Sequence, residues 1–202
     1  MALDIRIVVT DAAPLITLAA AKSLDYLLYP ALPVIIPDAV FHEATAAGGK
    51  LGAQEIIDWY RDHTDDVRIE PTEIFQKEMM LLEQGAQRIS RDVGERAALE
   101  VIRYTHLLND EDDRALLLSD DSGVERLIVI DPDRLILMTT WDYLRQLEEA
   151  QRIQSADAVL ELVMESGRNP PRRDLWSNHD PDVKDAVKAI LDQAHNNRPS
   201  GK

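Results

Sequence analysis

The chain has 202 residues, no cysteine and a formal net charge of −15. Without cysteine there are no disulfides, no thiolate metal sites and no cysteine nucleophile. The acidic balance argues against a nucleic-acid-binding surface built from Lys and Arg. It is compatible with a solubilising surface, a basic partner or carboxylates gathered around metal ions. The apolar fraction of 45% is sufficient for a buried core, and the length fits one domain, or one domain plus an appendage.

The amino-terminal stretch does not have the pattern of a targeting segment. Asp4 and Arg6 interrupt the apolar run that a signal peptide requires. No apolar run approaches the ~18–20 residues of a membrane-spanning helix. We therefore expect a cytoplasmic protein that does not associate with membranes.

Short apolar runs rich in β-branched residues predict strands, and the amphipathic or capped segments between them predict helices. In chain order, the predicted strands are 5–10, 33–37, 67–71, 115–118 and 133–140. The predicted helices are 12–28, 38–47, 53–63, 72–89, 91–108, 141–151 and 155–167. This alternation predicts an α/β fold with a mostly parallel sheet of about five strands and helices on both faces.

The carboxyl-terminal segment differs in texture from the rest of the chain. It contains two prolines in tandem at 170–171, a short helical pattern at 182–195 and a polar tail. We predict a main domain over residues 1–167 and an appendage over 168–202. The appendage would dock on the body of the protein or on a partner.

Acidic residues follow the predicted strands at the points where ligands gather in parallel sheets. Asp11 follows the first strand, and the adjacent pair Asp120 and Asp121 closes the fourth. Glu43 and Glu95 lie early in helices that begin at the same edge of the sheet. Carboxylates this close raise one another's pKa values, and Mg²⁺ or Mn²⁺ relieves that repulsion. Two such ions can activate water and stabilise the leaving oxygen of a phosphodiester.

The segments VVTDAAPLI, VIIPDAVFHEA, DVGERAALEVI and ALLLSDD, followed by LMTTWDYL, resemble PIN-domain nucleases. The likeness is greatest to the larger prokaryotic branch related to VapC-type toxins, and it spans residues 5–167. It implies a PIN-like three-layer α/β/α fold. The family's metal-binding and catalytic acids match Asp11, Glu43, Glu95 and Asp120, with Asp121 as an equally placed alternative. Its hydroxyl position after the fifth strand fits Thr139 and Thr140.

The same resemblance implies a Mg²⁺- or Mn²⁺-dependent endoribonuclease that hydrolyses RNA. It also implies a homodimer and, if the chain is the toxin of a toxin–antitoxin pair, an antitoxin protein that covers the site. The alternative is a catalytically weak or inactive PIN-like docking module. Two departures favour that alternative: the −15 charge, and Ala12 and Ala13 where the family usually has Thr or Ser and a second small polar residue.

Each acid also has a purely structural interpretation. Asp11 is a suitable cap for the helix that follows it, and Glu43 alone is compatible with a solvated helix position. Asp92 and Glu95 have the spacing of a capping box. The pair of aspartates after the fourth strand is suited to capping the next turn. The ordered placement of all these acids at one sheet edge favours the metal site over unrelated caps.

Three arginines near the Glu95 segment also have two interpretations. Arg88, Arg91 and Arg96 either form a basic rim that guides phosphates past the acidic residues or are ordinary solvated side chains. The five histidines show no metal-ligand spacing. The candidate metal site is therefore made of carboxylates alone.

Overall fold

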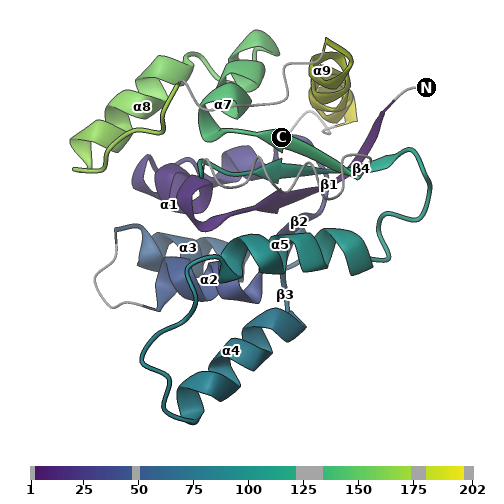
Figure 1. Ribbon diagram of the computed structural model, residues 1–202. Helices are drawn as coiled ribbons and strands as arrows, with labels where there is room; N and C mark the ends of the chain where they lie inside the picture. Colours follow the sequence, from purple (N-terminus) through teal and green to yellow (C-terminus); the bar gives the residue numbers. More distant parts are fainter. Residues whose placement is uncertain (1–2, 47–50, 122–133, 174–180, 198–202) are drawn as a thin grey trace.

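A computed structural model describes residues 3–46, 51–121, 134–173 and 181–197 of the chain. Its centre is one parallel sheet with the strand order β3-β2-β1-β4-β5 (Figure 1). The strands are β1 (Asp4–Thr10), β2 (Val34–Pro37), β3 (Val67–Glu70), β4 (Asp113–Leu118) and β5 (Leu135–Met138). The predicted α/β fold with a parallel five-stranded sheet is confirmed.

Helices connect these strands. They are α1 (Ala12–Ala20), the 3₁₀ helix η1 (Leu24–Leu28), α2 (Asp38–Thr45), α3 (Ala53–Asp62), α4 (Glu73–Glu83), α5 (Val93–Tyr104), α7 (Thr140–Glu149), α8 (Ala156–Glu165) and α9 (Pro181–Asn197). The single helix predicted over 12–28 is wrong, because Lys22 adopts a left-handed φ of 54°. The Ser23 amide then donates to the Leu18 carbonyl, which closes α1 with a Schellman-type bond.

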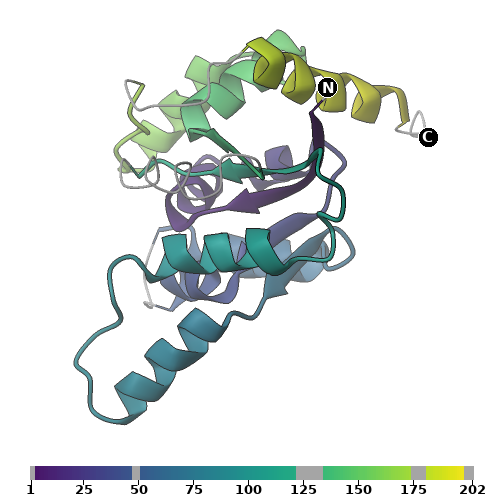
Figure 2. The same ribbon diagram turned by 45° about the vertical axis from the view of Figure 1, so that its right-hand side comes forward.

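The two faces of the sheet are buried in different ways. Alternate side chains of the strands enter the main core cluster, which also contains side chains of α1, α7, α8 and α9. The other set packs against α5 in a second cluster. Figures 1 and 2 show α5 on the side of the sheet away from α7 and α8. This is the three-layer α/β/α arrangement expected from the resemblance.

Helix α9 is packed into the body of the protein. Its Val183, Val187 and Leu191 are buried in the main cluster. Arg168, which precedes α9, donates from Nε to Thr17 Oγ1 at 3.1 Å and from a terminal nitrogen to the Ala13 carbonyl at 3.2 Å. These contacts show that the described part of 168–202 docks on the body. A domain boundary at 167/168 stays a prediction.

Helix α4 projects from the end of the molecule where β3 lies (Figures 1 and 2). None of its residues is fully buried, and Met80 and Leu81 are 57% and 51% exposed. It ends at Glu83, with Gln84 as its C-cap and well short of the predicted end at 89, because Gly85 takes a left-handed φ of 102°. In the described ranges, no helix has both the length and the hydrophobicity needed to cross a lipid bilayer.

Candidate active site

The register of the sheet brings the ends of β1 and β4 side by side. Thr10 lies opposite Leu118, and the Asp11 amide extends the ladder by donating to the Leu118 carbonyl at 2.9 Å. From β1 the chain first builds outward through β2 and β3, and later returns to build β4 and β5 on the other side. The junction of β1 and β4 is therefore the topological switch point, where parallel α/β sheets open a crevice at their carboxyl edge.

A cavity of about 170 Å³ lies at this junction and is called the acidic cavity below. Its lining residues are Asp11, Ala12, Ala13, Glu43, Arg91, Gly94, Glu95, Asp120 and Asp121. The structure thus brings all five predicted carboxylates around one space, from the ends of β1 and β4, the last turn of α2 and the first turn of α5. Within the described residues, no three acidic or histidine side chains converge to metal-ligand spacing. The carboxylates surround the space without meeting at a single point.

Asp11 is half-buried at the start of α1, and both of its carboxylate oxygens accept hydrogen bonds. Oδ1 accepts from the Ala12 amide at 2.8 Å, and Oδ2 accepts from the Ser119 hydroxyl at 3.0 Å. Burial raises the pKa of Asp11 to about 6, repulsion from Glu43 and Asp121 adds to this rise, and the two hydrogen bonds oppose it. Asp11 is also the N-cap of α1, so its capping interpretation holds alongside its place in the cavity.

Asp120 is held by Thr140, the first residue of α7. The Thr140 amide donates to Oδ1 and the Thr140 hydroxyl donates to Oδ2, both at 2.8 Å. Burial raises the pKa of Asp120, while the bonds from Thr140 and the charge of Arg168 lower it. Thr140 therefore fixes the direction of the Asp120 carboxylate and favours its ionised form. Thr139 has a separate task, because its hydroxyl accepts from the Asp142 amide and caps α7.

Gly94 leaves room beside the carboxylates. A Cβ atom added at this position would lie 3.5 Å from Asp11 Oδ1 and 3.6 Å from Glu43 Oε2. The backbone of α5 therefore comes close to both acids and leaves a methyl-sized space between them. The capping-box interpretation of Glu95 is not supported, because the Asp92 side chain makes no capping hydrogen bond at the start of α5.

Sequence reasoning missed Ser119 and Arg168. The Ser119 hydroxyl orients Asp11, and its position immediately before the aspartate pair was the available signal. The Ala12 amide donates to the other oxygen of Asp11, so each carboxylate oxygen accepts a hydrogen bond. These bonds form although Ala12 and Ala13 carry no hydroxyl. Arg168 approaches Asp120 from the segment after α8, and no local pattern marks it.

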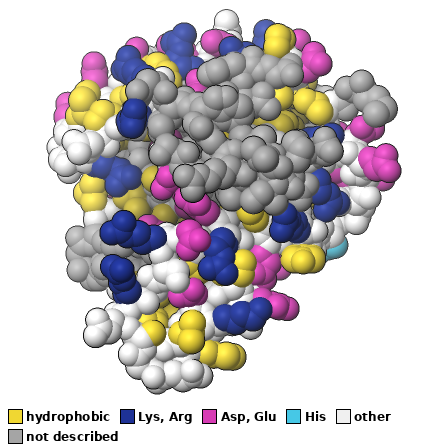
Figure 3. All heavy atoms as spheres, in the orientation of Figure 1, with side chains coloured by type: hydrophobic (Ala, Val, Ile, Leu, Met, Phe, Trp, Pro, Cys, Tyr) yellow, Lys and Arg dark blue, Asp and Glu magenta, His cyan; other side chains and the backbone are white. Residues whose placement is uncertain are grey.

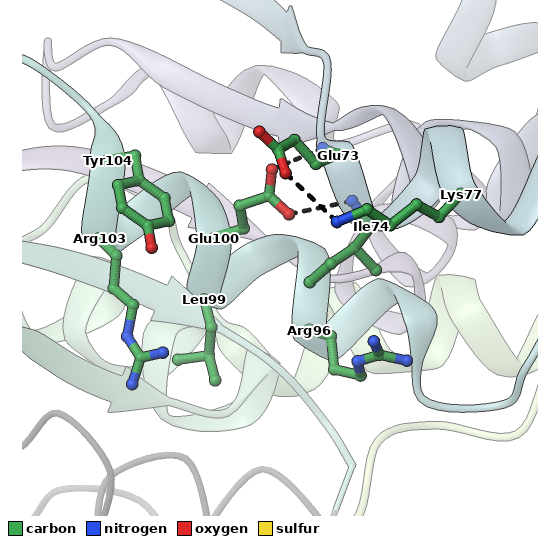
Figure 4. Close-up of a pocket in the computed structure, with 8 residues that line it drawn as sticks. All are labelled: Glu73, Ile74, Lys77, Arg96, Leu99, Glu100, Arg103 and Tyr104. Carbon is green, nitrogen blue, oxygen red and sulfur yellow. Dashed lines mark hydrogen bonds and ion pairs between the residues drawn. The ribbon is translucent and has the colours of Figure 1, made fainter.

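A larger cavity of about 500 Å³ lies between α4 and α5 (Figure 4). Its acids are already engaged: Glu100 accepts from the Glu73 and Ile74 amides at 2.6 and 3.1 Å, and Glu73 pairs with Lys77 at 3.3 Å. Glu100 thereby satisfies the amino-terminal amides of α4. This cavity therefore lies between two helices that Glu100 joins, and it does not bring carboxylates together at an edge of the sheet.

Lys and Arg side chains are interleaved with Asp and Glu on the face shown in Figure 3, although the whole chain carries a charge of −15. Arg91 contributes to this mixture at the acidic cavity itself and is exposed. Of the three arginines with two interpretations, Arg91 lines the acidic cavity, and Arg88 and Arg96 are not among its lining residues. The acidic balance of the chain does not exclude an anionic ligand here, because the exposed Arg91 is among the residues that line the cavity.

The parallel sheet with acids at its switch point defines an α/β domain with an acidic cavity at the carboxyl edge of the sheet. The family model for the PIN domain matches residues 7–122, which is more than half of the chain, and the chain belongs to the PIN-domain family. The match begins in β1 and ends just after Asp121, so it includes the whole set of cavity acids. A comparison with curated proteins finds no match. PIN domains are generally nucleases that act on nucleic acid and typically use divalent metals.

Proposed function

We propose that the chain is a Mg²⁺- or Mn²⁺-dependent endoribonuclease whose active site is the acidic cavity. The observation that carries this proposal is the gathering of Asp11, Glu43, Glu95, Asp120 and Asp121 around one space at the switch point of the sheet. The RNA substrate and the VapC-like relationship rest on the family resemblance.

The residues present suit a hard divalent cation. All the acidic ligands are carboxylates, which such ions prefer, and the methyl-sized space at Gly94 lies between two of them. The raised pKa of Asp11 reflects burial among like charges, which a bound cation would offset. The chemistry that a bound Mg²⁺ or Mn²⁺ supplies is activation of water and stabilisation of the departing oxygen.

The protein's own groups have distinct tasks in this proposal. Ser119 and the Ala12 amide orient Asp11, and Thr140 orients Asp120. Arg91 at the cavity wall would attract the backbone phosphates of the substrate. No side chain needs to act as a nucleophile, which agrees with a chain that has no cysteine.

The test is RNA cleavage in Mn²⁺ or Mg²⁺ by the wild-type chain and by the Asp11→Asn variant. A pooled RNA of random sequence avoids a guess at the target, and the same pool as DNA tests the preference for RNA. We expect cleavage of RNA that EDTA stops and that the variant lacks. The matched control is Glu161→Gln, an exposed acid on α8, which should cleave as wild type does. Equal cleavage by Asp11→Asn and wild type would refute the assignment.

The second candidate is a docking module without catalysis, favoured by Ala12, Ala13 and the −15 charge. In that case the acidic cavity would hold a structural cation or a basic segment of a partner, such as an antitoxin. Mn²⁺ binding without turnover on the RNA pool would select this function. A homodimer remains part of the proposal, and sedimentation equilibrium would test it.

A further inference from the structure

A second cavity of about 460 Å³ adjoins the acidic cavity and is called the ring pocket below. It lies between α2, α4 and the segment that leads into α5, and it is lined in part by His42, Phe75, Ile89 and Ser90. Glu43 and Arg91 line both cavities. The two cavities are therefore neighbours that share these two side chains.

The ring pocket has the lining expected for a flat aromatic group. The rings of His42 and Phe75 lie 5.2 Å apart between centroids, tilted by 49°, and both side chains are only half-buried. Aliphatic side chains of Ala39, Ile89 and Val93 supply the rest of the apolar wall. Aromatic rings with open edges or faces are stacking platforms for nucleobases of any sequence. The volume also falls within the range of small-ligand pockets, roughly 300–1,000 Å³.

The charges around the two cavities suit one nucleotide of a strand. The carboxylates of the acidic cavity suit divalent cations, which in turn would bind the phosphate that is cleaved. Arg91 lines both cavities and supplies a positive charge between them. The outer wall is anchored, because the Ser90 amide and hydroxyl both donate to the Glu78 carboxylate, at 3.1 and 2.8 Å. These two bonds tie the segment before α5 to α4. The ring pocket is thus built from three elements that are fixed to one another.

We infer that the ring pocket is a nucleobase subsite. It binds the base of the nucleotide next to the scissile phosphate and stacks this base on the Phe75 ring. Arg91 binds the adjoining phosphate. This inference rests on the proposed nuclease function and adds the part of the substrate that the site reads. Its natural ligand is a single-stranded segment, because a base enters the pocket only when it is unstacked and unpaired.

The test uses the full chain in EDTA and follows the histidine ring protons by NMR during titration with the four ribonucleoside 5′-monophosphates. The chain has five histidines, so the His42 signal can be assigned from a His42→Asn variant. We expect at least one nucleotide to shift the His42 signal and not that of His63, which ends α3, packs beside Trp59 and does not line the ring pocket. Ribose 5-phosphate, which lacks a base, should leave the His42 signal unchanged.

The two phenylalanines of the chain provide a matched pair of variants. Phe75→Leu keeps the apolar contact but removes the ring, and should weaken nucleotide binding about fivefold or more. Phe41→Leu removes a ring that packs against Tyr60, outside the pocket lining, and should leave binding unchanged. Ala46→Leu offers a second route if Phe75→Leu does not fold, because Ala46 is exposed and its larger replacement would fill the pocket.

Three results would overturn the inference: no nucleotide shifts the His42 signal, ribose 5-phosphate shifts it as strongly, or Phe75→Leu and Phe41→Leu bind alike. The titration requires neither a metal nor cleavage, so a failure of the nuclease proposal and a failure of the ring pocket are separate results.

Discussion

Replacement of Asp11 by Asn should make the metal-free protein more stable at pH 8. The pKa of this carboxyl is about 6 in the folded chain, against 3.8 for an ordinary aspartate, because of burial and the neighbouring acids. A difference of this size corresponds to about 3 kcal/mol against the ionised form. Asn removes the charge at nearly equal volume, but loses one acceptor for the Ser119 hydroxyl, which offsets about 1 kcal/mol. The expected net gain is about 1–3 kcal/mol.

The sign of the pH dependence follows from the raised pKa. Because the folded state binds this proton more tightly than the unfolded state, Asp11 contributes most stability below pH 4, and that contribution is lost as the pH rises toward about 6. The difference in unfolding free energy between Asp11→Asn and wild type should therefore be small or reversed at pH 4. It should grow in favour of the variant up to about pH 7.

Urea denaturation in EDTA from pH 4 to pH 8 measures this difference directly. Glu161→Gln is the control and should show no such trend, because its carboxylate is exposed on α8. Addition of Mn²⁺ should cancel or reverse the difference at pH 8, since an ion bound only by wild type at 100 times its Kd stabilises it by about 2.7 kcal/mol. A difference between Asp11→Asn and wild type that does not change with pH would refute the reasoning.

Gly94→Ala should leave the free energy of unfolding unchanged or raise it by up to about 1 kcal/mol, because Ala favours helix. It should weaken Mn²⁺ binding, because the added methyl group enters the space between the Asp11 and Glu43 carboxylates. Equal Mn²⁺ affinity by calorimetry would contradict this. Thr140→Val should also lower Mn²⁺ affinity, whereas Thr139→Val should cost about 1 kcal/mol of stability as a lost cap without changing metal binding. Leu191→Ala should cost about 2–5 kcal/mol in thermal or urea unfolding, since Leu191 is fully buried, against about 0.5 or less for the exposed Leu162→Ala. Similar losses in both would show that α9 does not belong to the core.

The sheet and the gathering of the acids could be predicted because both depend on simple local patterns. Apolar runs such as 115–118 mark buried parallel strands, and an acid that directly follows such a run must lie at the carboxyl edge. Glu95 lies in the first turn of α5, as expected, whereas Glu43 reaches the acidic cavity from the last turn of the short helix α2. The roles of these acids in binding and catalysis stay predictions.

The remaining features depend on contacts between distant parts of the chain. Nothing near Lys22 in the sequence indicates a left-handed residue, because that conformation is set by the way η1 packs after α1. The approach of Gly94 to Asp11 and Glu43 depends on how α5 lies across the sheet. The ring pocket likewise depends on how α4 and α2 lie relative to each other. Neither helix sequence by itself indicates this arrangement.

The pairing of β1 with β4 also determines when the acidic cavity can form during synthesis. Asp11 and Ser119 are 108 residues apart, and the bond between them requires β4 to have entered the sheet beside β1. Until the ribosome has released β4, a nascent chain exposes β1 as an unpaired edge and has no complete set of acids. Closing so long a loop is slow compared with forming local helices, so the centre assembles late. The acidic cavity therefore stays incomplete until more than half of the chain has been synthesised.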